Sequence, residues 1–299
     1  MKIGPKSILW SGLLLLAMLS IVVPLLNFIT VTLMMVPYVI LYTTLSRRAF
    51  ALHVLPVWLI AYLILGEAPL IIGLFFLIPS LVMGHLYRKQ APALKILASS
   101  MIAFLAQLLA ILFTLEVVLK LSLIRGMRDL VRETSADMQA KGLLPAGWNS
   151  DYTEEMIRLM TQSIPLTLIA MSFFYIVIAH YVSRRMLRRQ GVAVPGLPEA
   201  KDWRVPRIMV LYYLIIMVLD FIAANDQSFM TTAVVNLLPL IRFVFQVQAV
   251  GFMFFLAHER GWNKSIAVLM SIPVLLFPPL SLLGLFDAIF PIRRALKKS

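Results

Sequence analysis

The sequence has 299 residues, of which 61% are hydrophobic and only 14% are charged, and its mean hydropathy is +0.91. A soluble domain carries about 25% charged residues, so this composition excludes a chain whose surface faces mainly water. The net charge of +13 does not indicate a nucleic-acid partner, because the Lys and Arg residues cluster at the ends of apolar runs and are not interleaved with base-stacking aromatic residues.

The apolar runs are long and lack the alternation of a membrane strand, which predicts helices. A backbone inside a bilayer must satisfy its own hydrogen bonds, so we predict an all-α fold, a polytopic transmembrane helix bundle with eight or nine spans. The first run is uncharged from Ser7 to Ser46, which predicts two retained helices with a turn near 24–27 rather than a signal peptide. The candidate spans are 8–26, 29–46, 50–65, 68–87, 94–122, 160–183, 206–224, 231–257 and 265–290.

Basic residues set the predicted orientation. With the N-terminus in the cytoplasm, the inner loops hold more than half of the 27 Lys and Arg residues, and the outer turns near 27, 67 and 226 hold none. The last span does not fit, because nine crossings would leave the basic residues of 293–298 outside. Either the stretch 265–290 is re-entrant or broken at its prolines, or two spans are one, or the tail tolerates the outer side.

Two polar intervals separate the spans. The interval 124–158 lies on the extracytoplasmic side and carries apolar residues near helical spacing before a break at Gly142 and 145–147. It predicts an insert of two short amphipathic helices that lie on the outer membrane surface or cap the bundle. The interval 184–206 is a basic cytoplasmic loop that contains Pro195, Pro198 and Pro206, and it is too short to be a domain.

Charged and amide side chains inside the spans are the candidate functional residues, because a polar group in the membrane is costly. Arg242 lies deep in the span 231–257, and Gln246 follows on the same face. A buried guanidinium needs a partner, which is Asp220, Glu116, backbone carbonyls or an anionic ligand. We predict that Arg242, Gln246, Gln107 and Asp220 contact a small polar or anionic solute, and the alternative is a structural pairing of Arg242.

The span 94–122 carries two further patterns. Ser99, Ala103, Ala106 and Ala110 share one face, and small residues at this spacing predict close helix packing. Glu116 and Lys120 are four residues apart, which predicts an intrahelical ion pair near the outer end.

The catalytic and metal-binding motifs that this sequence approaches are incomplete. The sequence has no cysteine, and His258-Glu259-Arg260-Gly261-Trp262 lacks the second histidine of the zinc-protease helix. The histidines at 53, 85, 180 and 258 are scattered near helix ends. We therefore predict a protein that is not an enzyme and that needs no metal ion or cofactor.

Several local patterns resemble the YybS-like family of bacterial multi-pass membrane proteins. They are Met83-Gly84-His85-Leu86-Tyr87-Arg88-Lys89, Val194-Pro195-Gly196-Leu197-Pro198 with Trp203-Arg204-Val205-Pro206, Gln248, and the closing Gly284-Leu285-Phe286-Asp287. The resemblance implies location in the bacterial plasma membrane. The N-terminal half is also similar in layout to the substrate-binding subunits of energy-coupling-factor transporters, which implies a bundle that binds a small molecule. Gly12, Ala17 and Ser20 depart from the Ala-x-x-x-Ala spacing by which those subunits dock their energising partner.

The sequence therefore predicts one of two functions. The first is a small-molecule-binding or transport subunit that uses the residues around Arg242. The alternative is a non-enzymatic scaffold for cell-envelope, division or sporulation machinery, with the insert and the basic loop as docking surfaces for a membrane-protein partner. In both cases membrane lipids surround the protein.

Overall fold

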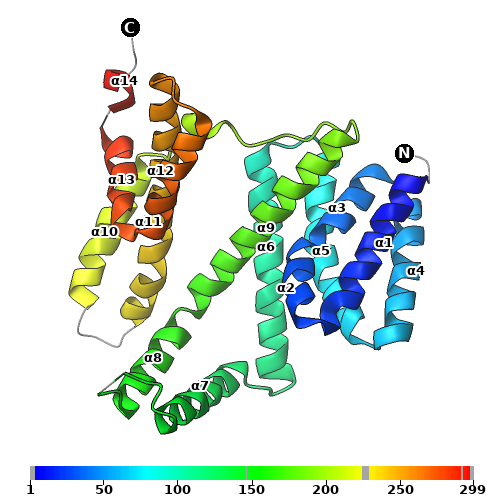
Figure 1. The fold of residues 1–299 in the computed structure, drawn as a ribbon, viewed down its shortest axis with the longest axis horizontal. Helices are drawn as coiled ribbons and strands as arrows, with labels where there is room; N and C mark the ends of the chain where they lie inside the picture. The colour runs from blue at the N-terminus through cyan, green and yellow to red at the C-terminus, as the bar shows by residue number, and fades with distance from the viewer. Residues whose placement is uncertain (1–3, 146, 224–228, 291, 297–299) are drawn as a thin grey trace. The chain divides into compact units, whose positions relative to one another are not determined.

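The computed structural model describes residues 4–145, 147–223, 229–290 and 292–296 (Figure 1). All regular secondary structure in these ranges is helical, which confirms the predicted all-α fold. The chain forms two compact units. The first unit is Met1–Leu123 with Leu168–Leu197, and the second unit is Ile124–Thr167 with Pro198–Ser299.

Among the described residues, six helices are long and apolar enough to cross a membrane, namely Pro5–Val22, Arg47–Leu65, Ala68–Arg88, Ala93–Val118, Ile164–Arg189 and Phe229–Glu259. Lys264–Leu276 and Pro278–Ile289 form a pair bent by 117°, which makes up to seven if the pair is one span. The prediction of a multi-pass membrane protein is confirmed. The number falls short of eight or nine because Ile29–Thr44 and Ile208–Ile222 are shorter apolar helices.

The helices of the first unit begin and end at residues suited to those places. α1 (Pro5–Leu19) and α2 (Pro24–Leu33) both start at a proline, whose fixed φ and missing N–H suit a first turn. The turn between α1 and α2 therefore ends at Val23, just before the predicted turn near 24–27. The unit continues with α3 (Met35–Thr44), α4 (Arg47–Leu65), α5 (Ala68–Arg88), α6 (Ala93–Phe113) with its π-helical end η2 (Thr114–Val118), and the part of α9 (Ile164–Arg189) from 168 onward.

Buried aromatic side chains hold the first unit together. Tyr38, Tyr87 and Phe104 are among its largest fully buried side chains. The indole Nε1 of Trp58 donates a hydrogen bond of 2.7 Å to the Tyr38 hydroxyl, and the Tyr87 hydroxyl lies 2.8 Å from His180 Nδ1. These bonds satisfy polar atoms that lie away from water and link α3 to α4 and α5 to α9.

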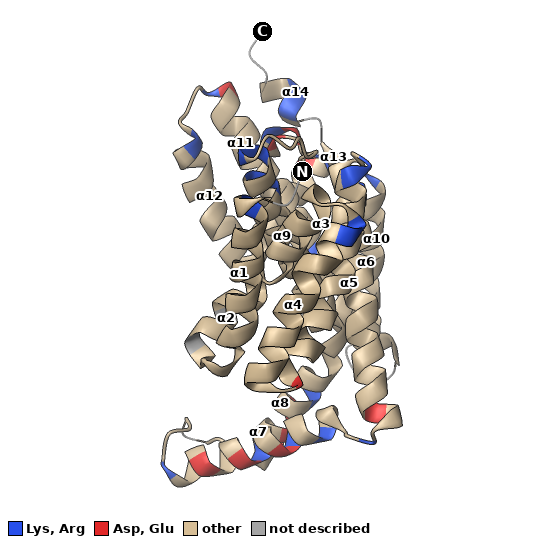
Figure 2. Ribbon diagram, turned by 90° about the vertical axis from the view of Figure 1, so that its right-hand side faces the viewer, with Lys and Arg blue, Asp and Glu red and all other residues tan. Residues whose placement is uncertain are grey.

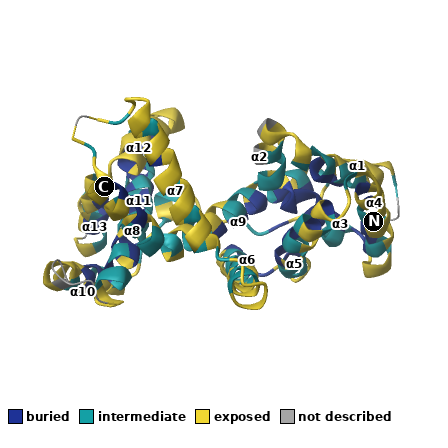
Figure 3. Cartoon of the chain, turned by 90° about the horizontal axis from the view of Figure 1, so that it is seen from below, coloured by how far each residue is buried: buried dark blue, intermediate teal, exposed yellow. Residues whose placement is uncertain are grey.

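The second unit is arranged around one long helix, α11 (Phe229–Glu259). Against it pack α10 (Ile208–Ala223), α12 (Lys264–Leu276), α13 (Ser281–Ile289) and the short helix η3 (Ala200–Asp202). The last helix, α14 (Ile292–Leu296), and the turn η4 (Pro278–Leu280) complete this part. Figure 3 shows α10 exposed along much of its length, and its exposed side chains are mainly apolar, as suits a helix that faces lipid.

The insert forms the two predicted amphipathic helices, α7 (Leu123–Ala140) and α8 (Ser150–Gln162). α7 carries acidic and basic residues along its length (Figure 2). The Asn149 side chain accepts a hydrogen bond of 3.1 Å from the Tyr152 N–H and so begins α8. Arg132 of α7 makes bonds of 2.7 and 3.0 Å to the carboxylate of Glu154 of α8. The position of the insert on the membrane surface stays a prediction.

The predicted basic loop begins later than its sequence suggested. α9 continues to Arg189, so its C-terminal arginines lie on helix rather than on a loop. The chain leaves the helix at Gly191, whose φ of +80° favours glycine.

Candidate functional site

Three amide side chains of α11 are buried, those of Asn236, Gln246 and Gln248. An amide inside a membrane bundle is costly unless both its oxygen and its nitrogen find partners. Each of the three bonds to the backbone of a different neighbouring segment, at a place where that backbone lacks a regular helical hydrogen bond.

Asn236 bridges the break between α8 and α9. In a continuous helix the Leu166 N–H would donate to the Gln162 carbonyl, but Pro165 interrupts the ladder at this point. Instead, Asn236 Oδ1 accepts from the Leu166 N–H at 2.8 Å, and Asn236 Nδ2 donates to the Gln162 carbonyl at 2.8 Å. The side-chain amide thus takes the place of one missing backbone bond.

Gln246 performs a similar task at the end of α12. Pro278 and Pro279 have no N–H to offer to the carbonyls four residues earlier, which are those of Val274 and Leu275. The Nε2 atom of Gln246 lies 3.1 Å from the Val274 carbonyl and 3.4 Å from the Leu275 carbonyl, so it donates to the oxygens that the prolines leave open.

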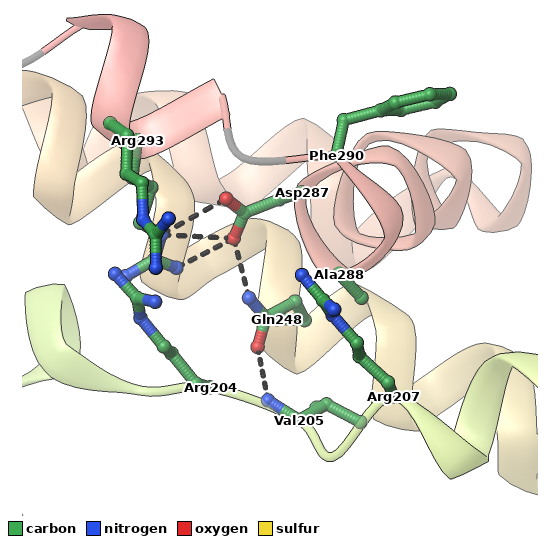
Figure 4. Close-up of a pocket in the computed structure, with 9 residues that line it drawn as sticks. Arg204, Val205, Arg207, Gln248, Asp287, Ala288, Phe290 and Arg293 are labelled. Carbon is green, nitrogen blue, oxygen red and sulfur yellow. Dashed lines mark hydrogen bonds and ion pairs between the residues drawn. The ribbon is translucent and has the colours of Figure 1, made fainter.

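Gln248 connects the segment before α10 to a buried ion pair. Its Oε1 accepts a hydrogen bond of 2.8 Å from the Val205 N–H, and its Nε2 donates to the carboxylate of Asp287. Arg293 holds the same carboxylate through Nη2 at 2.7 Å and Nε at 3.0 Å (Figure 4). Its Nη1 donates to the Lys201 carbonyl at 2.6 Å. The side chains of Arg293 and Asp287 are only 4% and 1% exposed, so each charge depends on the other.

Gly284 allows α13 to carry Asp287 up to α11. A Cβ atom at this glycine would lie 1.9 Å from the backbone oxygen of Phe245 and 2.8 Å from the Ala249 nitrogen. Real carbon atoms do not approach backbone that closely, so the helices can meet here only because residue 284 has no side chain.

A cavity of about 140 Å³ lies beside the Gln248–Asp287–Arg293 contacts. Its lining residues are Arg204, Val205, Arg207, Gln248, Asp287, Ala288, Phe290, Arg293 and Arg294. We call it the arginine cavity. Figure 4 shows Arg204 and Arg207 beside the Gln248–Asp287 pair. Arg204, Arg207 and Arg294 are exposed, and within the part of the chain that the structure describes they make no ion pair. The lining holds four arginines and one carboxylate, which Arg293 already neutralises. Such an excess of guanidinium groups suits a small anion.

The predicted solute-contacting residues have different surroundings. Arg242 is half-buried on α11 and forms no hydrogen bond or ion pair with any described residue. Asp220 is exposed on α10, and Gln246 already donates to the end of α12. Gln107 belongs to the first unit, where its buried Oε1 atom has no partner among the described residues. Their contact with a solute stays a prediction.

The small-residue stripe and the Glu116–Lys120 pair, both predicted in the span 94–122, also differ from expectation. Packing within the first unit uses the neighbouring face of Ala93, Ile96, Ser100 and Phe104, which are buried. Of the predicted stripe, Ser99 and Ala103 are half-buried, whereas Ala106 and Ala110 are exposed. Glu116 and Lys120 do not share a continuous helix, because η2 ends at Val118 and Lys120 has a φ of +55°.

Sequence reasoning did not place Asp287, Arg293, Arg204 or Arg207 among the predicted site residues. The signal was present, since Asp287 is the one acidic residue after Glu259 and stands in an apolar stretch. Its importance was hidden because its partner lies beyond the helix end. In the described ranges no group of three or more His, Asp or Glu residues is placed to hold a metal ion.

Comparison with known proteins agrees with this architecture. The chain is 22% identical over 239 residues to "Uncharacterized protein YybS" of Bacillus subtilis (strain 168), which covers 76% of each chain. No solved structure matches. A family described as "Predicted membrane protein (DUF2232)" matches residues 13–288, which is most of the chain. The protein therefore belongs to this family of membrane proteins and is YybS-like, as its local sequence patterns indicated.

Proposed function

We propose that this protein binds a small anion in the arginine cavity, as a solute-binding or transport subunit of the bacterial plasma membrane. The observation that carries the proposal is the convergence of Arg204, Arg207 and Arg294 on a lining whose one carboxylate is already paired. Free guanidinium groups repel each other, and a carboxylate or phosphate group that bonds to two of them removes that cost. A volume of about 140 Å³ suits a single such group better than a large substrate.

The proposed topology places this cavity on the cytoplasmic side, with the N-terminus also inside. Its support is the concentration of basic residues at 184–207, which includes Arg204 and Arg207. Eight crossings follow if the shorter apolar helices each cross and the bent pair α12–α13 is re-entrant. The Arg293 bond to the Lys201 carbonyl supports the re-entrant reading, because it ties the end of the chain to the basic loop.

The proposed role is binding rather than catalysis. Asp287 is the acid nearest to the bound anion in this scheme, but both its oxygens are occupied by Arg293, and one also accepts from Gln248. A carboxylate held in this way stabilises the site and is poorly placed to take a proton from a substrate.

Titration calorimetry of the purified full-length protein tests the proposal, with inorganic phosphate and succinate as separate probes. Arg204→Gln with Arg207→Gln should weaken binding by at least about tenfold, because two charge-assisted hydrogen bonds are lost. Arg47→Gln with Arg48→Gln is the matched control, since these exposed arginines lie in the first unit. Equal effects of the two variants, or no heat with either probe, would overturn the assignment. Native mass spectrometry of the gently purified protein would identify the solute that it carries.

Arg242 provides a second place for the solute in the same function. It is half-buried in α11, and no described residue neutralises it. Arg242→Ala should reduce anion binding without lowering the melting temperature if the guanidinium contacts solute. A lower melting temperature with unchanged binding would identify it as structural.

A scaffold role is favoured by one separate observation, the exposed apolar residues of the insert. Leu130, Leu143 and Tyr152 are 63%, 65% and 58% exposed, although the insert lies outside the candidate spans. A membrane-protein partner could cover them. Co-purification of a stoichiometric membrane protein that is lost with Leu130→Ser and Tyr152→Ser would favour this role over solute binding.

A further inference from the structure

From Met171 onward, α9 carries an exposed stripe whose side chains change from apolar to basic along the helix. Met171, Phe174 and Tyr181 are 38%, 52% and 63% exposed, and Arg185 and Arg188 are exposed one and two turns later. Steps of three and four residues place all of them on one face. The stripe therefore runs from apolar side chains through a tyrosine to arginines within a single helix.

The arginine end of this stripe is hollowed. Tyr181, Arg184, Arg185, Arg188 and Arg189 line a hollow of about 410 Å³, which is open to the surroundings. The sequence has no acidic residue from 156 to 198, so no carboxylate near in sequence balances these arginines. In the described ranges none of the four forms an ion pair.

One of these arginines is fixed in place by the backbone that follows the helix. Arg184 donates through Nε to the Val194 carbonyl at 3.2 Å. Its guanidinium lies against Gly196, where a Cβ atom would come within 2.2 Å of Nη2. The Nη groups have no hydrogen bond with described residues and remain available to a ligand. This arginine is therefore oriented before any ligand binds, which reduces the entropy lost on binding.

We propose that this face of α9 binds an anionic glycerophospholipid, with the phosphate held by Arg184, Arg185 and Arg188 and an acyl chain along Met171 and Phe174. The order of the stripe matches the order of groups in a lipid, because aromatic residues with a polar tip favour the headgroup level and arginines extend to the phosphates. A soluble phosphate would have no use for the exposed apolar part. Basic clusters next to a spanning helix on the cytoplasmic side are suited to anionic lipids. This site is separate from the arginine cavity and does not depend on its function.

The test is native mass spectrometry of the full-length protein in detergent with equal amounts of phosphatidylglycerol and phosphatidylcholine that carry the same acyl chains. We expect the native protein to retain phosphatidylglycerol preferentially. Arg185→Gln with Arg188→Gln should reduce that preference on the order of tenfold, since each basic residue contributes to headgroup attraction. Arg47→Gln with Arg48→Gln removes the same charge from another exposed place and should leave the preference intact.

Three results would overturn the proposal. They are equal retention of the two lipids by the native protein, equal losses in the two glutamine variants, and displacement of the lipid by millimolar inorganic phosphate, which would indicate a site for a soluble anion. Arg185→Lys with Arg188→Lys guards against misfolding, because it keeps the charge and should keep most of the preference. Phe174→Ser should weaken lipid retention without changing phosphate binding at the arginine cavity, and no loss of retention would contradict the acyl-chain assignment.

Discussion

The side-chain amide of Asn236 donates a 2.8 Å hydrogen bond to the backbone carbonyl of Gln162, 74 residues earlier in the chain. Together with the bond from the Leu166 N–H, it closes a gap that a proline opens in the helical ladder. A side chain that replaces a backbone bond in this way is needed by the fold whether or not a ligand is bound.

Asn236→Ala should therefore destabilise the protein by roughly 1–3 kcal/mol, because it leaves the part-buried N–H of Leu166 and the part-buried carbonyl of Gln162 without partners. The measurement is the denaturation midpoint in detergent. Leu237→Ala is the control, since Leu237 on the same helix is 46% exposed and should change stability little. Similar shifts for the two variants would show that the amide bridge is unimportant.

Asp287→Asn should destabilise the second unit more than most substitutions. It leaves the guanidinium of Arg293, which is 4% exposed, without its counter-charge, and breaking a buried pair from one side costs about 3–5 kcal/mol. Thermal unfolding of the purified protein measures the loss. Asp287→Leu combined with Arg293→Met should recover part of it, because no unpaired charge remains. Glu199→Gln, at a side chain that is 67% exposed, should have little effect.

Gly284→Ala should push α13 away from α11. The added carbon would lie 1.9 Å from the Phe245 oxygen, and backbone cannot yield as a flexible side chain can, so we expect a loss of about 1–3 kcal/mol or more. Gly126→Ala is the matched control. Nothing lies within 4 Å of that position in α7, so alanine should be neutral or slightly stabilising there. The denaturation midpoint should fall for Gly284→Ala, whereas for Gly126→Ala it should stay the same or rise slightly.

The link between α7 and α8 should weaken in acid. The hydrogen bond from Arg132 lowers the pKa of Glu154 below its ordinary value of 4.5, so the carboxylate is favoured in the folded insert. A lowered folded-state pKa means that the stabilisation is complete above 4.5 and is lost as the pH falls through the folded value. Hydrogen–deuterium exchange rates in α8, corrected for the intrinsic effect of pH on exchange, should rise as the pH is lowered from about 6 to about 3.

Glu154→Gln supplies the control for this acid effect. It should raise exchange in α8 already at neutral pH and remove most of the acid dependence. If the native protein and the variant respond to acid alike, another carboxylate is responsible, and Glu155, whose pKa is lowered by Arg158, is the first to examine.

The sequence predicted the elements more successfully than their contacts. Apolar runs with basic ends identified each of the six long apolar helices of the described residues, because a helix that faces lipid must be composed mainly of apolar residues. The two helices of the insert were predicted correctly, because apolar residues recur at helical spacing and Gly142 marks the break after the first of them. The number of spans was less predictable, since hydropathy does not reveal that the apolar helices Ile29–Thr44 and Ile208–Ile222 are short or that a proline pair bends another apolar run by 117°.

The candidate site was less predictable for a different reason. Arg242 was conspicuous because a charge inside an apolar run stands out, whereas Arg293 follows the last apolar run and resembles an ordinary cytoplasmic tail residue. Its partner Asp287 lies six residues earlier. The pair is joined to α11 through Gln248, which lies 39 residues before Asp287 and donates a hydrogen bond to its carboxylate. Such a triad depends on the close approach of two helices, which no local pattern encodes.

The amide contacts of α11 have a consequence for the order of assembly. The carbonyl of Gln162 is synthesised long before Asn236, and the Val205 N–H long before Gln248. During synthesis these backbone groups must remain with water, headgroups or the insertion machinery until α11 enters the membrane. Because Asp287 and Arg293 come later still, a chain halted after α11 can close the break between α8 and α9 but leaves the Lys201 carbonyl without Arg293, so it should stay accessible to proteases at η3.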